Sequence, residues 1–237
     1  MFNKNLIGSL EQICNITDTL ILKYPVTYAK SNIGNIFVKI PVSKLDPDEF
    51  SDIGFNHSLG DFLSFVRIMP DDRDITLNGE IIYAKSNDVS ASFITDSLSL
   101  LEDYNIDSHV FERTAMVPDV AVFDLTVDDL KRLNNASKVF KNLYDIVLES
   151  KDDKTMIYLA NLSILNADSN NYTITKNLKA DKEFKISVSV EDLNKLPLTD
   201  YELHVKYNEE AKKSKYRLVL KSKSLEDFEI ILCCNVD

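Results

Sequence analysis

A repeated order of secondary-structure elements constrains this chain more than any single motif does. Each copy has a short strand, a short amphipathic helix and then two or three strands of alternating polarity, and three copies occur. The clearest copy covers residues 120–164, and the others begin at residues 50 and 184. Apolar side chains that recur every second residue on strands and about every 3.6 residues on helices predict sheets with helices packed on one face. The repeat therefore predicts an α+β fold built from duplicated units.

The same periodicities predict where the elements lie. We expect helices at residues 6–16, 59–68, 126–142 and 190–196, and strands at residues 26–30, 36–40, 50–56 and 172–176, among others. Between residues 98 and 118 neither period is sustained, so this segment is interpreted as a connector that packs on the body through its apolar side chains. A chain of 237 residues suits one large domain or two domains of about 120 residues each. We expect an N-terminal domain at residues 1–112 and a C-terminal domain at residues 119–237.

Composition places the protein among soluble chains with a sizeable core. Hydrophobic residues make up 44% of the sequence, yet no run approaches the roughly 18 apolar residues of a membrane helix. The N-terminus lacks the apolar region of a secretory signal, and the three cysteines have no metal-binding spacing. These features predict no membrane partner and a cytoplasmic location, in the host cell if the protein is viral.

Catalytic motifs are missing from the sequence. The five glycines all lie at or before position 79, so no glycine-rich phosphate loop or dinucleotide motif can be assembled. His57, His109 and His204 are far apart and accompany no nucleophile motif. The acidic groups at residues 46–49 and 71–74 are more typical of solvated turns than of metal sites. The sequence therefore predicts a protein that is not an enzyme and that has no catalytic residue, metal or cofactor.

The predicted helix at residues 126–142 carries the most informative charge pattern. Its apolar side chains fall on one side, and no acid occurs between Asp129 and Asp145. Thr126 and Asp129 have the spacing of a capping box. Lys131, Arg132, Lys138 and Lys141 fall toward the other side with two asparagines, a set that suits contact with phosphates of any sequence. An ordinary solvated helix face is an equally open interpretation, and the other helices add only Lys4, Arg67 and Lys195.

At this point the order of elements can be compared with a known family. The whole chain resembles a DNA polymerase sliding clamp of the two-domain type found in tailed phages and in PCNA. The resemblance lies in the order of the elements and in their local sequence character at residues 50–77, 120–150 and 183–207. It does not rest on a short diagnostic motif. It implies duplicated clamp domains with antiparallel sheets outside and helices lining a central hole.

The resemblance also implies a function and an assembly. Three two-domain protomers would form a ring, a homotrimer, that encircles duplex DNA without reading its sequence and tethers a DNA polymerase for processivity. An ATP-driven clamp loader would be a further partner. The formal net charge of −11 would ordinarily disfavour binding to phosphates. A ring that holds DNA topologically needs few cations, and here Lys131, Arg132, Lys138 and Lys141 would dominate its inner surface.

Two further sets of residues follow from the resemblance alone. Ring closure in the family pairs an edge strand of one protomer with an edge strand of its neighbour, which here would involve Val89, Ala91, Phe93, Tyr172, Ile174 and Lys176. Partner peptides bind beneath the connector, and the matching residues are Met116, Val117, Pro118, Leu232, Cys233 and Val236. An equally open interpretation of this second set is that its members are core residues.

Two other functions stay open from the sequence. One is a monomeric polymerase processivity subunit of the viral type, which would have the same fold and bind DNA directly through one basic face. The other helices carry few cations, which disfavours this function. A monomer that does not encircle DNA must be held on it by binding affinity alone. The other is a structural virion or assembly protein built from duplicated β-rich domains.

Overall fold

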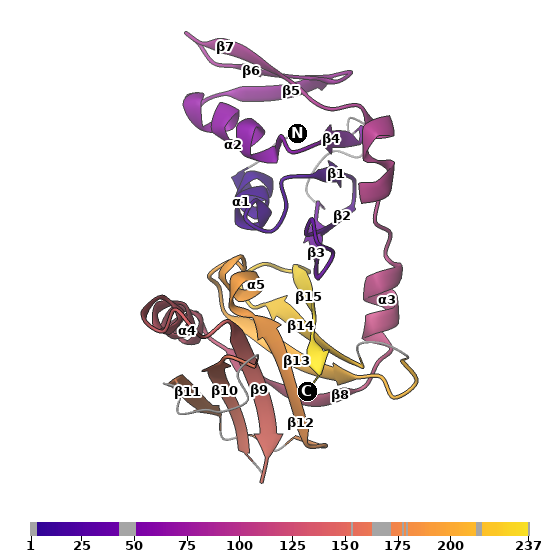
Figure 1. Cartoon of the computed structure of the whole chain (residues 1–237). Coiled ribbons are helices and arrows are strands. Elements are labelled where there is room, and N and C mark those ends of the chain that lie inside the picture. Colours follow the sequence, from indigo (N-terminus) through magenta and orange to yellow (C-terminus); the bar gives the residue numbers. More distant parts are fainter. Residues whose placement is uncertain are drawn as a thin grey trace. The chain divides into compact units, whose positions relative to one another are not determined.

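The computed structural model describes residues 4–42, 51–152, 154–162, 172–176, 178, 180–211 and 215–236, without the side chains of Lys4, Asn5 and Val236. The chain divides into two compact units, Met1–Ser108 and His109–Asp237 (Figure 1). All paired strands within each unit are antiparallel. The acidic residues predicted as a turn at positions 46–49 lie outside the described residues.

The first unit packs two helices against short antiparallel strands. Its helices are α1 (Lys4–Ile13) and α2 (Leu59–Ile68), followed by the 3-10 helix η2 (Leu98–Tyr104). Its strands are β1 (Leu20–Leu22), β2 (Val26–Lys30), β3 (Ile36–Pro41), β4 (Ile53–Phe55), β5 (Asp74–Asn78), β6 (Ile81–Lys85) and β7 (Ser90–Ile94). Strand β1 pairs with β4, β2 with β3, and β5, β6 and β7 form a three-stranded sheet.

An aromatic cluster joins α2 to the three-stranded sheet. The Phe93 ring on β7 lies 5.6 Å from the Phe62 ring and 5.7 Å from the Phe65 ring, centroid to centroid. Both helix residues are on the apolar face of α2, whose other buried members are Leu59, Leu63 and Val66. Aromatic pairs at such distances contribute about 0.5–1.5 kcal/mol beyond the area they bury. The amphipathic pattern of α2 thus fixes which face of the sheet it covers.

Gly54 is required where β4 approaches the chain before η2. A Cβ atom at this position would lie 2.5 Å from the Asp96 carbonyl oxygen and 2.7 Å from the Leu101 side chain. The backbones of Gly54 and Asp96 form an isolated bridge there. Any side chain at Gly54 would therefore push η2 away from the body of the first unit.

In its described residues, the second unit contains two antiparallel sheets and three helices. The helices are α3 (His109–Ala115), α4 (Val127–Val139) and α5 (Val190–Asn194). One sheet has the order β11 (Tyr172–Lys176), β10 (Lys154–Ala160), β9 (Asp145–Lys151), β12 (Phe184–Ser189) and β16 (Asn235–Val236). The other includes, in order, β15 (Glu229–Cys233), β14 (Tyr216–Ser222), β13 (Tyr201–Tyr207) and β8 (Asp119–Leu125).

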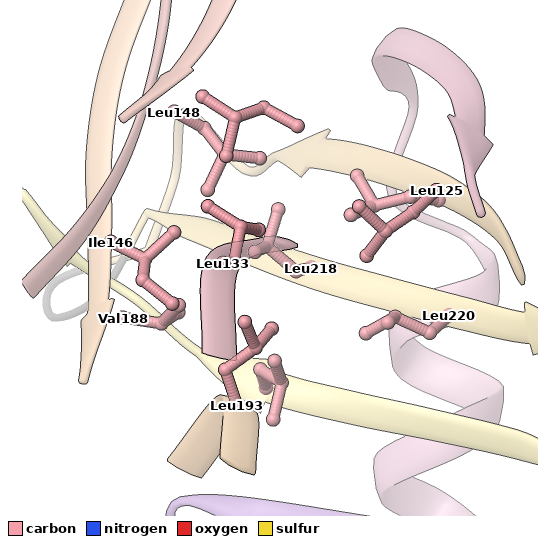
Figure 2. Close-up of a pocket in the computed structure, with 11 residues that line it drawn as sticks. Leu125, Leu133, Ile146, Leu148, Val188, Leu193, Leu218 and Leu220 are labelled. Carbon is pink, nitrogen blue, oxygen red and sulfur yellow. The ribbon is translucent and has the colours of Figure 1, made fainter. Parts of the chain in front are cut away.

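The core of the second unit is formed by apolar side chains from both sheets and two helices. A small cavity of about 10 Å³ lies among them (Figure 2), close to the least volume that holds one water molecule. Leu133 of α4 and Leu193 of α5 meet Leu218 and Leu220 of one sheet and Ile146 of the other around it. Because its lining is apolar and its volume is so small, the cavity is a packing defect and not a ligand site.

Most predicted elements agree with the structure, and the connector differs. The antiparallel α+β prediction is confirmed, and α2, β2 and β11 have the predicted bounds. Helix α1 ends at Ile13 instead of residue 16, and α4 ends at Val139 because Phe140 leaves the helical conformation at φ −97° and ψ 68°. The connector, for which the sequence pattern predicted no helix or strand of its own, contains η2 and α3. Only Phe111 and Thr114 of α3 are buried, too few to produce a helical pattern in the sequence.

Candidate functional site

Helix α4 begins with a full capping box. The Thr126 hydroxyl accepts a hydrogen bond from the Asp129 backbone N–H at 3.1 Å, and Asp129 Oδ2 accepts one from the Thr126 N–H at 3.0 Å. Asp200 Oδ1 accepts a third from the Val127 N–H at 2.7 Å. These bonds satisfy backbone donors that the first turn of a helix leaves without partners. The first turn of α4 is therefore held firmly in place.

The exposed face of α4 is basic. Leu130, Leu133 and Ala136 are buried, whereas Lys131, Arg132 and Lys138 are exposed, and Lys141 is exposed just beyond the helix. Lys131, Asn135 and Lys138 follow one another at spacings of four and three, which places them on one stripe of the helix surface. Within the described part of the chain, none of the four basic side chains forms an ion pair. We call Lys131, Arg132, Lys138 and Lys141 the α4 cations.

The other predicted DNA-facing cations differ from the α4 cations because acids accompany them. Arg67 Nε lies 3.0 Å from Glu11 Oε1 of α1. Lys195 Nζ lies 2.8 Å from Glu191 Oε1 and 3.8 Å from Asp192 Oδ1. Lys4 begins α1, and its side chain is outside the described part. Of the predicted DNA-facing cations whose side chains the structure describes, the α4 cations are therefore the ones that form no ion pair.

Strands β7 and β11 each end a sheet, and no described strand pairs with their outer edges. On β7, Phe93 faces α2, and the half-buried Ala91 lies two residues away on the same face, whereas Val89 is exposed just before the strand. On β11, Lys176 Nζ lies 2.5 Å from Asp129 Oδ2 of α4. Tyr172 and Ile174 alternate with exposed threonines and share the α4 side with Lys176. The named side chains on β7 and β11 therefore face the helices. Pairing with another strand would use the backbone N–H and C=O groups on the free edges of β7 and β11.

The residues predicted for a partner-peptide pocket differ widely in exposure. Met116 is 84% exposed and Pro118 is exposed, whereas Val117 is half-buried. Leu232 is 2% exposed and lines the core cavity, so the alternative interpretation as a core residue is the correct one for it. Cys233 is exposed at the end of β15, while the Val236 side chain lies outside the described part. Although Cys233 is exposed, partial desolvation of its sulfur by neighbouring atoms raises the pKa of the thiol.

The histidines lie in separate local networks. His57 Nδ1 is 3.1 Å from Asp18 Oδ1, His109 Nδ1 is 3.4 Å from Glu112 Oε2, and His204 lies between Asp119 and Glu202. Among the described residues, no group of three or more histidine, cysteine or acidic side chains could hold a metal ion. In the same part of the chain, no helix is long and apolar enough to span a membrane.

Comparison with known proteins shows the fold class. No family model and no curated protein sequence matches the chain. Among solved structures, A. fulgidus PCNA in complex with the C-terminal region of FEN-1 is similar with a TM-score of 0.64 and 13% identity, covering 98% of this chain and 96% of that one. PCNA from Entamoeba histolytica is similar with a TM-score of 0.64 and 11% identity, over 97% and 94% of the two chains.

Bacterial clamps are similar over the same part of this chain. A putative DNA polymerase III β subunit from Eubacterium rectale has a TM-score of 0.66 and 10% identity, covering 98% of this chain and 63% of that one. The chain therefore has the sliding-clamp fold. It matches PCNA over nearly the full length of both chains, and so has the two-domain form of that fold.

Proposed function

We propose that this protein is a non-enzymatic sliding clamp that encircles duplex DNA and tethers a DNA polymerase. The observation that carries the proposal is the basic face of α4 on a chain with the sliding-clamp fold. The α4 cations form no ion pair with any acid that the structure describes, which leaves their charge available for phosphates. The asparagine between two lysines on the stripe adds a hydrogen-bond donor that suits phosphate contact at any sequence.

The distribution of charge reconciles this function with a net charge of −11. A few cations per protomer give weak contacts that form and break as the ring moves, and topology retains the DNA. Strong contacts would slow sliding along the duplex. Acids beside Arg67 and Lys195 keep the contact surface confined to α4.

We further propose that three protomers close the ring by pairing the free edge of β7 with the free edge of β11 in a neighbour. Unpaired strand edges readily add a further strand. The side chains of Phe93 and Lys176 fix each edge strand on the helix behind it. In this arrangement an ATP-driven loader opens the ring, and a polymerase docks near the exposed Met116 and Pro118.

Primer extension on a circular template tests the proposal. With the polymerase and loader of the same source, the clamp is expected to lengthen the products in an ATP-dependent manner. The variant K131Q/K138Q is expected to shorten them, whereas K154Q/K221Q, which removes the same charge from exposed strand positions, is the matched control. Product lengths that do not respond to the protein would contradict the proposal.

A second candidate is a monomeric processivity subunit that binds DNA through α4 alone. Four cations on or just after one helix that form no ion pair within the described ranges favour it. This candidate predicts a protein that stays monomeric and binds linear duplex DNA as well as circular DNA.

A further inference from the structure

Two basic side chains hold the segment after the unit boundary on the sheet of the second unit. Arg217 on β14 donates a hydrogen bond from Nη1 to Thr114 Oγ1 of α3. Lys206 on β13 donates one from Nζ to the Val117 carbonyl oxygen at 2.8 Å. Lys206 and Arg217 lie directly opposite each other on neighbouring strands, so both side chains project from the same face. We call Lys206 and Arg217 the connector latch.

Burial makes the connector latch stronger than a surface contact. Thr114 is fully buried, and the Lys206 side chain is only 9% exposed. The Thr114 hydroxyl also donates to the Val110 carbonyl oxygen at 2.7 Å, so it is satisfied on both sides only while Arg217 is present. Hydrogen bonds that involve a charged group are stronger than those between neutral groups. Removal of one buried partner also leaves the other polar group without a hydrogen bond, which destabilises the fold.

Lys206 belongs to a row of charged side chains on β8 and β13. Lys206 Nζ lies 3.0 Å from Asp119 Oδ1, and His204 Nδ1 lies 3.1 Å from Asp119 Oδ2. His204 Nε2 lies 2.9 Å from Glu202 Oε1. Burial alone would raise the pKa of Asp119, but hydrogen bonds from Lys206 and His204 outweigh it and hold that pKa below its ordinary value. Asp119 therefore stays ionised and orients the Lys206 ammonium group toward Val117.

The first unit offers a natural comparison, because lysines also contact the connector there. Lys23 Nζ lies 2.6 Å from Asn105 Oδ1, and Lys30 Nζ lies 3.0 Å from the Asp103 carbonyl oxygen. Both bonds are exposed to solvent, unlike the bonds of Lys206 and Arg217. Exposed contacts of this kind contribute little to stability, since water competes for the same groups.

We propose that Lys206 and Arg217 are positioning residues that fix α3 and residues 116–118 on the sheet, so that the exposed Met116 is presented in one arrangement to an apolar side chain of a partner protein. The part that concerns a partner rests on the proposed clamp function. The fixed position of the segment does not, because it follows from contacts within one unit.

Hydrogen–deuterium exchange on the full chain, without DNA or polymerase, tests the proposal. In K206M/R217M we expect amides of residues 110–117 to exchange about tenfold faster, while those of β13 and β14 change little. K206R/R217K retains the donors and is expected to restore most of the protection. K23M/K30M is the comparison in the first unit, with little change expected. R217M alone keeps the Asp119 row intact and is expected to show part of the effect if the double variant does not fold.

Two results would overturn the positioning role. Unchanged exchange at residues 110–117 in both R217M and K206M/R217M would show that these side chains do not hold the segment. Equally faster exchange over the whole second unit would show a general stabilising role instead. Primer extension separates these outcomes from failure of the clamp function, since a protein without clamp activity can still show the local exchange effect.

Discussion

Lys176 Nζ lies 2.5 Å from Asp129 Oδ2, although the two residues are 47 positions apart in the chain. The same carboxylate oxygen accepts hydrogen bonds from the Thr126 backbone N–H and hydroxyl at 3.0 and 2.8 Å. A single carboxylate thus joins the edge strand β11 to the cap of α4. In the proposed ring, the strand that meets a neighbour is therefore tied to the helix that meets DNA.

Replacing Lys176 tests this connection through stability. The variant K176M leaves Asp129 partly buried without its cation, since the two side chains are 21% and 10% exposed. We expect the free energy of unfolding to fall by about 1–3 kcal/mol at neutral pH, the cost of removing one partner of a buried polar group. Urea unfolding measures it, with K154M on the exposed start of β10 as control. A change no larger than that of K154M would contradict the role of Lys176.

The pH dependence of the same variant has a defined sign. Burial alone would raise the pKa of Asp129, but hydrogen bonds from Lys176 and Thr126 outweigh it and lower that pKa. The stabilisation is present above the unfolded pKa of about 3.9 and is lost as pH falls through the lower folded value. The stability difference between the parent protein and K176M should therefore shrink below about pH 4. A difference that grows on acidification would contradict this assignment.

The capping box predicts a second stability effect. T126A removes the hydroxyl that accepts the Asp129 backbone N–H, and such losses cost about 1 kcal/mol. T126S keeps an oxygen in place and is expected to stay close to the parent protein. Equal destabilisation of both variants in urea would indicate that the Thr126 methyl group, and not the cap, is responsible.

The free edge of β7 predicts an effect on assembly. The Thr95 N–H bonds to the Glu80 carbonyl oxygen across the hairpin, so by alternation the Ser92 N–H points away from β6. S92P removes that donor at a solvent-facing position, whereas S92A keeps it. We expect S92P to fold but to lose oligomers in light scattering, and S92A to retain them. Assembly of S92P would show that this edge does not pair.

The α4 cations predict a change in the salt dependence of DNA binding. If Lys131 and Lys138 each contact a phosphate, K131Q/K138Q lowers the slope of log affinity against log salt by about 2. Fluorescence anisotropy on duplex DNA at low salt measures this slope, with K154Q/K221Q as control. A slope equal to that of the parent protein would place the DNA contacts elsewhere.

Local periodicity was sufficient to predict the elements that pack through a single face. Helix α2 was predicted residue for residue because its apolar spacing is regular and Pro70 follows closely. The exposure of Lys131 and Lys138 followed from the same helical spacing. Both features depend on residues within a few turns, which is the range over which sequence patterns carry information.

Contacts between distant residues were not predictable in this way. Helix α3 contacts the sheet through the hydrogen bond from Arg217 to Thr114, residues that are 103 positions apart in the chain. The apolar pattern within α3 is too short to indicate a helix. Lys176 was expected to face a neighbouring subunit, yet no local signal shows that it meets Asp129. Leu232 was assigned to the partner pocket from the resemblance, with a core position as the alternative, and only the packing of both sheets shows that it is core.

The mass of the assembled protein in solution tests the central claim most directly. Light scattering over a concentration series is expected to show a species near 81 kDa, three times the 27.0 kDa of one chain. That species should lose mass in S92P and keep it in S92A. A parent protein that stays at 27.0 kDa at every concentration would contradict the ring and leave the monomeric processivity subunit as the better account.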